Sequence, residues 1–157
     1  MCGVVGYIAK EQVKTNIISS LKEMEYRGYD SAGIAIITSE DTFLYKEVGK
    51  LNNLINATVK LTYNSAAIGI GHTRWATHGG VTKANAHPHK GEHSLVVHNG
   101  IIENYTEIKA ELLKKQIKFC SDTDSEVIVH LFELLLKEHN NNPIEATKEI
   151  IKKLKGA

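Results

Sequence analysis

Runs of apolar residues, bounded by glycine or by short polar turns, divide the first half of the chain into strands and helices. They predict four strands, over Gly3–Ala9, Ala32–Thr38, Thr42–Val48 and Ala66–Gly71. After the first strand, apolar residues recur at helical spacing. This predicts an amphipathic helix over Gln12–Tyr26 whose inner face is formed by Val13, Ile17, Leu21 and Met24. Leu51–Lys60 predicts a further short helix.

The second half carries longer helical patterns between polar segments. Ser94–His98 predicts a strand, and the next helix is marked by Ile101, Tyr105, Ile108 and Leu112. Lys118–Ser121 is a candidate edge strand. The remaining segments, His72–Gly80 and Ala84–Glu92, are polar and without period, so they predict loops at strand ends.

Two sequence signals mark the start of the last two helices. Thr123–Glu126 has the capping-box form, in which the threonine oxygen accepts the amide of Glu126 and the glutamate reaches back; this predicts a helix from Thr123. Its apolar face is Val127, Ile128, Leu131, Leu134 and Leu135. Pro143 after Asn142 predicts the first turn of the last helix, which ends at Lys155–Gly156. That helix is expected to turn inward Ile144, Thr147, Ile151 and Leu154.

Composition narrows the class of protein. The 157 residues suffice for one domain with a core, and 42% hydrophobic with 24% charged residues is typical of a soluble globular chain. Lys and Arg number 19 against 18 Asp and Glu, so nothing favours nucleic acid or an anionic membrane as partner. No apolar run is long enough to cross a bilayer, and no secretory signal is present. The two cysteines, Cys2 and Cys120, make no disulfide framework, so we expect a reducing, cytoplasmic setting.

Cys2 is the first candidate for chemistry. If Met1 is removed, Cys2 carries a thiol and a free α-amine, whose ordinary pKa is about 7.7–8.0. The thiolate is the nucleophilic form of cysteine, and an amine on the same residue can act as its base. The alternative is a small buried residue that opens a strand.

Three polar segments at strand ends accompany this cysteine: Glu25–Gly33, Gly71–Gly79 and His98–Asn104. Together with Cys2 they resemble the glutaminase domain of the class II glutamine amidotransferases, which are N-terminal nucleophile hydrolases. Four motifs are similar, more narrowly, to the branch of glutamine–fructose-6-phosphate aminotransferases: Tyr26–Gly33, Trp75–His78, Asn85–His89 and Thr123–Glu126. Branches that aminate phosphoribosyl pyrophosphate or aspartate share the general pattern.

The resemblance implies a role for each candidate residue. Cys2 would attack the side-chain amide of L-glutamine, and the Asn99 side chain with the Gly100 backbone N–H would form the oxyanion hole. Arg74 would bind the α-carboxylate of glutamine, and Asp124 its α-ammonium group. The other expected site residues are Trp75, Thr77 and His78 lining the site, and Arg27 and Gly28 near the Cys2 amine.

The resemblance also implies a fold and partners. The fold is α+β, a four-layer αββα sandwich of two antiparallel sheets flanked by helices. Residues 1–157 would be an amidotransferase domain that is incomplete at its C-terminal end, without the sugar isomerase domain. Fructose 6-phosphate would bind only through that missing domain, the full-length protein would be a homo-oligomer, and no cofactor is implied.

Each motif also has a plainer interpretation. Asn99–Gly100 alone is typical of a hairpin turn, and Asp124 of an acid in the first turn of a helix. Trp75 is an alternative core anchor, and Arg27 an alternative ion-pair partner of Asp30. For the whole chain, the alternatives are another class II amidotransferase, such as an amidophosphoribosyltransferase, or a truncated glutamine-binding module without turnover.

The histidines suggest a rival chemistry, a metal site. His87, His89 and His93 are close in sequence, and three more lie nearby: His72, His78 and His98. No cysteine or glutamate accompanies them at a familiar ligand spacing, so we expect no bound metal. His87-Pro88-His89 is more simply interpreted as a rigid surface loop, and Cys120 as an idle thiol.

Overall fold

The structure is a computed structural model that describes residues 2–63 and 67–156. These residues form two compact units. The first contains the chain up to Pro88 together with Val97–Asn99, and the second contains His89–Val96 together with the chain from Gly100 onward. Within the described residues, none of the helices is both long and apolar enough to cross a membrane.

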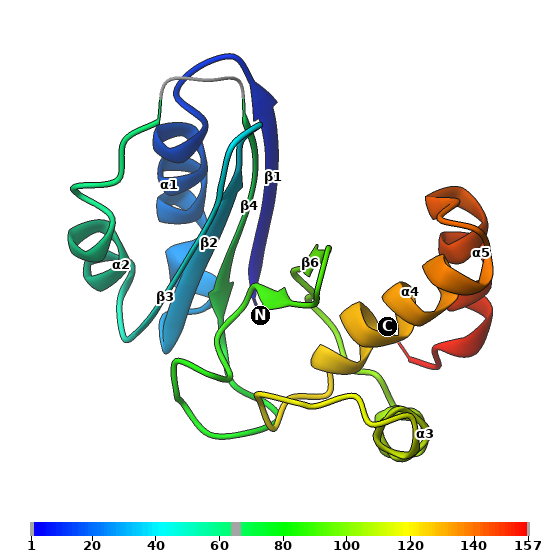
Figure 1. Ribbon diagram of the computed structural model, residues 1–157. Helices are drawn as coiled ribbons and strands as arrows, with labels where there is room; N and C mark the ends of the chain where they lie inside the picture. The colour runs from blue at the N-terminus through cyan, green and yellow to red at the C-terminus, as the bar shows by residue number, and fades with distance from the viewer. Residues whose placement is uncertain (1, 64–66, 157) are drawn as a thin grey trace. The chain divides into compact units, whose positions relative to one another are not determined.

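The first unit is built on a four-stranded antiparallel sheet (Figure 1). Its strands are β1 (Gly3–Ala9), β2 (Ser31–Ile37), β3 (Thr42–Val48) and β4 (Ala67–Arg74), in the order β1-β4-β2-β3. Helices α1 (Val13–Met24) and α2 (Leu51–Ala57) cover one face, and a 3-10 turn, η1 (Glu25–Arg27), follows α1. β1 and β2 both pair with β4, so β4 is central and carries residues to the site.

The core of this unit lies between the sheet and α1 and α2. Its fully buried members include Val13, Ile17, Leu21, Ile34, Ile36 and Leu54. Gly69 and Gly71 of β4 face α1, since a Cβ at Gly69 would lie 2.3 Å from the Ile17 side chain. The alternation of strand side chains therefore turns His72 and Arg74 to the opposite face of the sheet.

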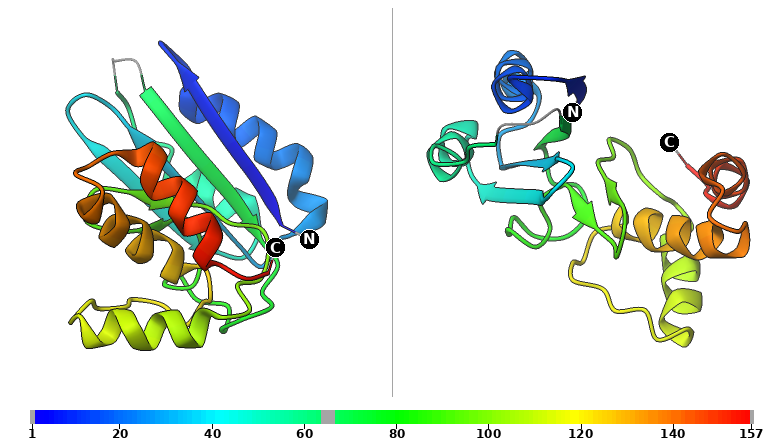
Figure 2. Two further views of the ribbon diagram at one scale, coloured as in Figure 1. Left: turned by 90° about the vertical axis from the view of Figure 1, so that its right-hand side faces the viewer. Right: turned by 45° about the horizontal axis from the view of Figure 1, so that its top comes forward.

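The second unit holds the short antiparallel pair β5 (His89–Lys90) and β6 (Leu95–Val96) and three helices. These helices are α3 (Tyr105–Lys114), α4 (Glu126–Glu138) and α5 (Pro143–Lys153), and α4 packs against both of the others (Figure 2). Its core is Ile102, Ile108, Leu112, Val127, Leu131, Leu135, Ala146 and Ile150. The Glu133 carboxylate of α4 accepts the amides of Glu92, His93 and Ser94, and so holds the turn between β5 and β6.

Several sequence predictions are confirmed. Gly3–Ala9 and Thr42–Val48 are strands with the predicted bounds, and the helix predicted to start at Pro143 does so. The Asn142 side chain caps it by accepting the amides of Ile144 and Glu145. The predicted start of the fourth strand, Ala66, lies outside the described residues.

The loop predicted from His72 is wrong at its start, because β4 continues to Arg74. His72, Thr73 and Arg74 are polar, but each is paired to β2 and buried. Their backbone bonds come from the two neighbouring strands, and polarity alone did not reveal them. The loop predicted over Ala84–Glu92 also contains a strand, β5, whereas Lys118–Ser121 forms none.

The predicted capping box is wrong. Helix α4 begins at Glu126 with Ser125 as N-cap, and no side chain caps it. The Glu126 carboxylate instead accepts the amides of Cys120 and Ser121, at 2.8 and 2.7 Å. The Glu126 carboxylate therefore binds two amides of the preceding loop, whereas in a capping box it would bind the amide of Thr123.

The inner face predicted for α5 is confirmed only at Leu154, which packs against the core of the second unit, and is wrong for the helix itself. Ile144 and Ile151 are 64% and 68% exposed, while Ala146 and Ile150 are buried in the core of the second unit. A small alanine lets two helices approach closely, which favours this face against α4.

Candidate active site

Cys2 lies directly before β1, beside the end of β4. Its Sγ accepts the Trp75 amide at 3.3 Å and is 3.8 Å from the Trp75 carbonyl oxygen. The Gly3 amide donates to Thr73 Oγ1 at 3.1 Å. A Cβ at Gly3 would lie 2.7 Å from that oxygen, so glycine permits the close packing that places the cysteine here. The half-buried thiol is thus held against the backbone of the loop after β4.

Arg74 is buried and organises that loop. Its guanidinium donates to the carbonyl oxygens of His78, at 2.5 Å, and Gly80, at 3.2 Å. Thr77, which directly precedes His78, is exposed. A guanidinium has five N–H groups, so Arg74 can anchor the loop and still present donors to a carboxylate.

Asp30 supports the loop of the candidate site, whereas the sequence predicted it only as an alternative partner of Arg27. Its carboxylate accepts the Ala76 amide and the Ser31 hydroxyl. Arg27 instead donates to the Tyr26 hydroxyl and stacks over its ring, so the alternative ion pair with Asp30 is wrong. The Asp30 side chain therefore holds the loop after Trp75 through a backbone amide of that loop. Its position in the motif between two glycines was the only sequence signal.

Gly28 and Trp75 complete this side of the site. A Cβ at Gly28 would lie 2.9 Å from the Arg74 carbonyl carbon, so only glycine fits between the two segments. Trp75 is 47% exposed and meets Tyr29 edge-to-face at 5.4 Å. The alternative that Trp75 anchors the core is therefore wrong.

Asn99 lies close to the cysteine. Its Nδ2 donates to the Cys2 carbonyl oxygen at 3.2 Å. Within residues 67–156 no strand pairs across Asn99–Gly100, and the chain leads instead to α3, so the hairpin alternative is wrong. Cys2, Arg74, Trp75 and Asn99 all belong to the first unit, and Gly100 follows Asn99 as a residue of the second.

The peptide before Asn99 is bound by two buried histidines. His72 Nε2 is 3.0 Å from the His98 carbonyl oxygen, and the His98 amide donates to His87 Nδ1 at 3.2 Å. Burial lowers the pKa of His72 to about 4, with Arg74 and His98 adding to the effect against the opposing His98 hydrogen bond. His72 is therefore neutral at neutral pH.

Asp124 belongs to the second unit and is buried. Its Oδ2 accepts the Ile102 amide at 2.7 Å, and Ser125 donates to its Oδ1 at 3.4 Å. Because α4 begins at Glu126, Asp124 lies before the helix, and its interpretation as a first-turn acid is wrong.

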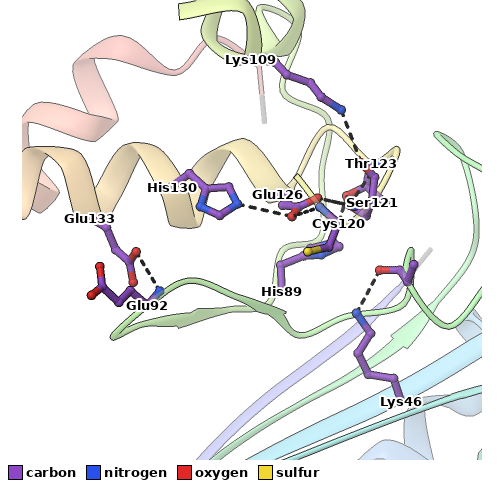
Figure 3. Close-up of polar contacts among 11 residues, drawn as sticks. Lys46, His89, Glu92, Lys109, Cys120, Ser121, Thr123, Glu126, His130 and Glu133 are labelled. Carbon is purple, nitrogen blue, oxygen red and sulfur yellow. Dashed lines mark hydrogen bonds and ion pairs between the residues drawn. The ribbon is translucent and has the colours of Figure 1, made fainter. Parts of the chain in front are cut away.

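Glu126 is a second buried acid near Asp124, and it binds the loop that precedes α4 (Figure 3). Burial opposes its ionisation. Hydrogen bonds from His130, from the Ser121 side chain and from two backbone amides outweigh it and lower the pKa to about 2. Glu126 therefore ties the segment just before Asp124 to the start of α4. The capping-box pattern marked this residue but assigned it the wrong partner.

The histidines do not form a metal centre in the part of the chain that is described. His87 and His89 are buried, which corrects their interpretation as a surface loop. His89 Nε2 lies 2.9 Å from Thr123 Oγ1, and His93 lies by the exposed Glu92. The ring nitrogens of these histidines therefore contact different partners and do not converge on one point.

A family model described as a glutamine amidotransferase domain matches residues 58–141. The chain belongs to the glutamine amidotransferase domain family. It is 52% identical to a glutamine–fructose-6-phosphate aminotransferase (isomerizing) of Campylobacter jejuni and 49% identical to that of Aquifex aeolicus. Each match covers the whole chain but 26% of the relative, so the amidotransferase chain spans about a quarter of the length of these curated relatives.

Two solved structures share the fold of this amidotransferase domain. One is described as the allosteric regulatory enzyme of purine biosynthesis, with a TM-score of 0.83 and 25% identity. The other is glutamine phosphoribosylpyrophosphate amidotransferase from B. subtilis, with a TM-score of 0.81 and 24% identity. Each match covers all of this chain and 34% of the other. The expected N-terminal nucleophile hydrolase fold with two antiparallel sheets is confirmed.

Proposed function

We propose that this chain is the glutamine-hydrolysing part of an enzyme that converts fructose 6-phosphate to glucosamine 6-phosphate. The observation that carries the proposal is the position of Cys2 directly before β1, with its carbonyl oxygen accepting a hydrogen bond from the Asn99 carboxamide at 3.2 Å. The identity of 52% to an aminotransferase of this kind, over the whole chain, supports the acceptor.

In the proposed reaction, the Cys2 thiolate attacks the amide carbon of glutamine. The α-amine of Cys2, free once Met1 is removed, takes the thiol proton and returns it to the departing ammonia. A thioester forms as the C–N bond breaks. Water then attacks the thioester carbon, the C–S bond breaks, and glutamate leaves with the thiol restored.

The remaining site residues have proposed roles in binding and stabilisation. Asn99 and the Gly100 amide stabilise the oxyanion, at about 2.7–4 kcal/mol for one such donor. Arg74 binds the α-carboxylate of glutamine and Asp124 its ammonium group. The lining of the site is assigned to Trp75, Thr77 and His78, and support of the Cys2 amine to Arg27 and Gly28.

The wider assignments belong to the same proposal. Residues 1–157 form a single amidotransferase domain, which is supported by TM-scores of 0.83 and 0.81 over the entire chain. Fructose 6-phosphate binds through a separate isomerase domain, and the full-length protein is a homo-oligomer. The cytoplasm is the proposed compartment, since both cysteines are free thiols.

The experiment that tests the proposal measures glutamate release from glutamine by the wild type and two cysteine variants. Cys2→Ala removes the nucleophile and should lower turnover by at least 10³-fold, while Cys120→Ala, at the other free thiol, should change it less than twofold. Turnover retained by Cys2→Ala would overturn the proposed nucleophile. Ammonia from wild-type turnover should appear in glucosamine 6-phosphate when the isomerase part is supplied, and release without transfer would reject that acceptor.

A further inference from the structure

The peptide group of His98 is held on both sides by imidazole rings. His72 Nε2 lies 3.0 Å from its carbonyl oxygen, and its amide donates to His87 Nδ1 at 3.2 Å. A carbonyl oxygen only accepts, so His72 carries its proton on Nε2. An amide only donates, so His87 Nδ1 is unprotonated. His72 therefore acts as a hydrogen-bond donor at Nε2, and His87 acts as an acceptor at Nδ1.

Stacking and packing on the sheet hold the two imidazole rings in place. They stack at 4.2 Å with an angle of 15° between their planes, and both are at least 96% buried. His72 stands in the middle of the sheet, opposite Gly33 of β2. A Cβ at Gly33 would lie 2.0 Å from the His87 carbonyl oxygen, so the segment of His87 packs directly on the sheet.

This arrangement ends at the proposed oxyanion hole. Asn99 follows His98 directly, and its Nδ2 lies 3.2 Å from the Cys2 carbonyl oxygen. A shift of about 1 Å in a group that positions a reacting atom can cost on the order of 10²-fold in rate. Fixing the peptide before Asn99 is therefore a direct way to fix its carboxamide.

We propose that His72 and His87 are positioning residues, which hold the His98 peptide so that the Asn99 carboxamide faces the glutamine carbonyl attacked by Cys2. The proposal rests on the proposed function and adds to it a role for the buried histidine pair. It requires a hydrogen-bond donor at the Nε2 position of residue 72 and an acceptor at the Nδ1 position of residue 87.

Amide side chains of two lengths separate this role from simple filling of the core. The Gln amide reaches the position of a histidine Nε2, and the Asn amide that of Nδ1. His72→Gln and His87→Asn keep the required atoms, whereas His72→Asn and His87→Gln move the same amide to the wrong place. We expect kcat for glutamine hydrolysis to fall less than threefold in the first pair and at least tenfold in the second. KM should change by less than twofold throughout.

The second measurement repeats the mismatched variants in an Asn99→Ala background. If they act through Asn99, their tenfold effect on kcat should shrink to less than threefold there. Equal losses of kcat in matched and mismatched variants, or a loss that persists without Asn99, would overturn the positioning role. Glutamine turnover by the wild type would still support the proposed function in that case.

A third measurement does not depend on activity. Hydrogen exchange of the His98 amide should be slow in the wild type and in His87→Asn, and at least tenfold faster in His87→Gln. Equal exchange in both variants would overturn the contact itself. A wild type that protects this amide but hydrolyses no glutamine would instead overturn the proposed function, and the positioning role with it.

Discussion

At the scale of single residues, the candidate site residues of each unit are supported by side chains that bind backbone groups. Arg74 and Asp30 both bind the backbone of the loop that follows Trp75, and Glu126 binds the amides before Asp124. Such contacts fix loops that carry few apolar anchors of their own. The candidate substrate-binding residues are thus supported by charged residues that bind peptide groups.

Gly33 allows a residue-scale prediction about these contacts. Gly33→Ala places a Cβ 2.0 Å from the His87 carbonyl oxygen, so the segment of His87 must move. We expect the free energy of unfolding to fall by about 1–3 kcal/mol, the usual cost of overpacking, with loss of glutamine hydrolysis. The matched control is Gly6→Ala in the same sheet, where a Cβ meets nothing within 4 Å. Denaturant unfolding of both variants checks this, and equal stability would contradict it.

At the scale of elements, apolar periodicity predicted the strands of the first sheet and the position of α1. It failed where polar residues are buried. The segment from His72 to Arg74 was predicted as a loop because its residues are polar. A strand end that carries candidate site residues is polar on the face where those residues lie. It also failed for α5, where both isoleucine faces fit the pattern and packing against α4 selected Ile150.

The two adjacent isoleucines of α5 test this packing. Ile150 is 6% exposed and Ile151 is 68% exposed. Ile150→Ala should lower the free energy of unfolding by about 2–4 kcal/mol, since it leaves a cavity in the core of the second unit, whereas Ile151→Ala should change it by less than about 0.5 kcal/mol. Chemical denaturation compares them directly. A larger effect at Ile151 would restore the face expected from the sequence.

At the scale of the whole molecule, the motif resemblance predicted the family and the fold class, which the comparisons confirm. The Asn99 carboxamide donates to the Cys2 carbonyl oxygen, and the catalytic roles of the two residues stay predictions. The supporting contacts were beyond sequence reasoning. Asp30, Glu126 and His87 act through backbone groups of other residues, and a peptide group carries no sequence signal.

The free energy of unfolding should fall in two steps as the pH is lowered. The pKa of His72 is about 4 in the folded chain against an ordinary 6.5, so the unfolded chain binds more protons between these values. Stability is therefore lost as the pH falls from 6.5 to 4, by on the order of 3 kcal/mol. Glu126, with a pKa of about 2 against 4.5, adds a similar loss from pH 4.5 to 2.

Two variants separate these steps in unfolding curves measured across this pH range. His72→Gln should flatten the dependence above pH 4.5, and Glu126→Gln the dependence below it. Glu145→Gln is the control: its Lys148 partner also lowers the pKa of Glu145, but solvent screens that exposed pair, so both steps should stay in place. A His72→Gln curve with the wild-type slope above pH 4.5 would contradict the assignment of the first step.

The most direct test of the central claim, that Cys2 is a glutamine-acylated nucleophile, is the intact mass of the chain before and after 6-diazo-5-oxonorleucine. This glutamine analogue is an electrophile at the position of the amide carbon. We predict loss of Met1, one adduct mapped to Cys2, none at Cys120, and protection by excess glutamine. Retained Met1, or labelling of both thiols that glutamine does not slow, would contradict the account.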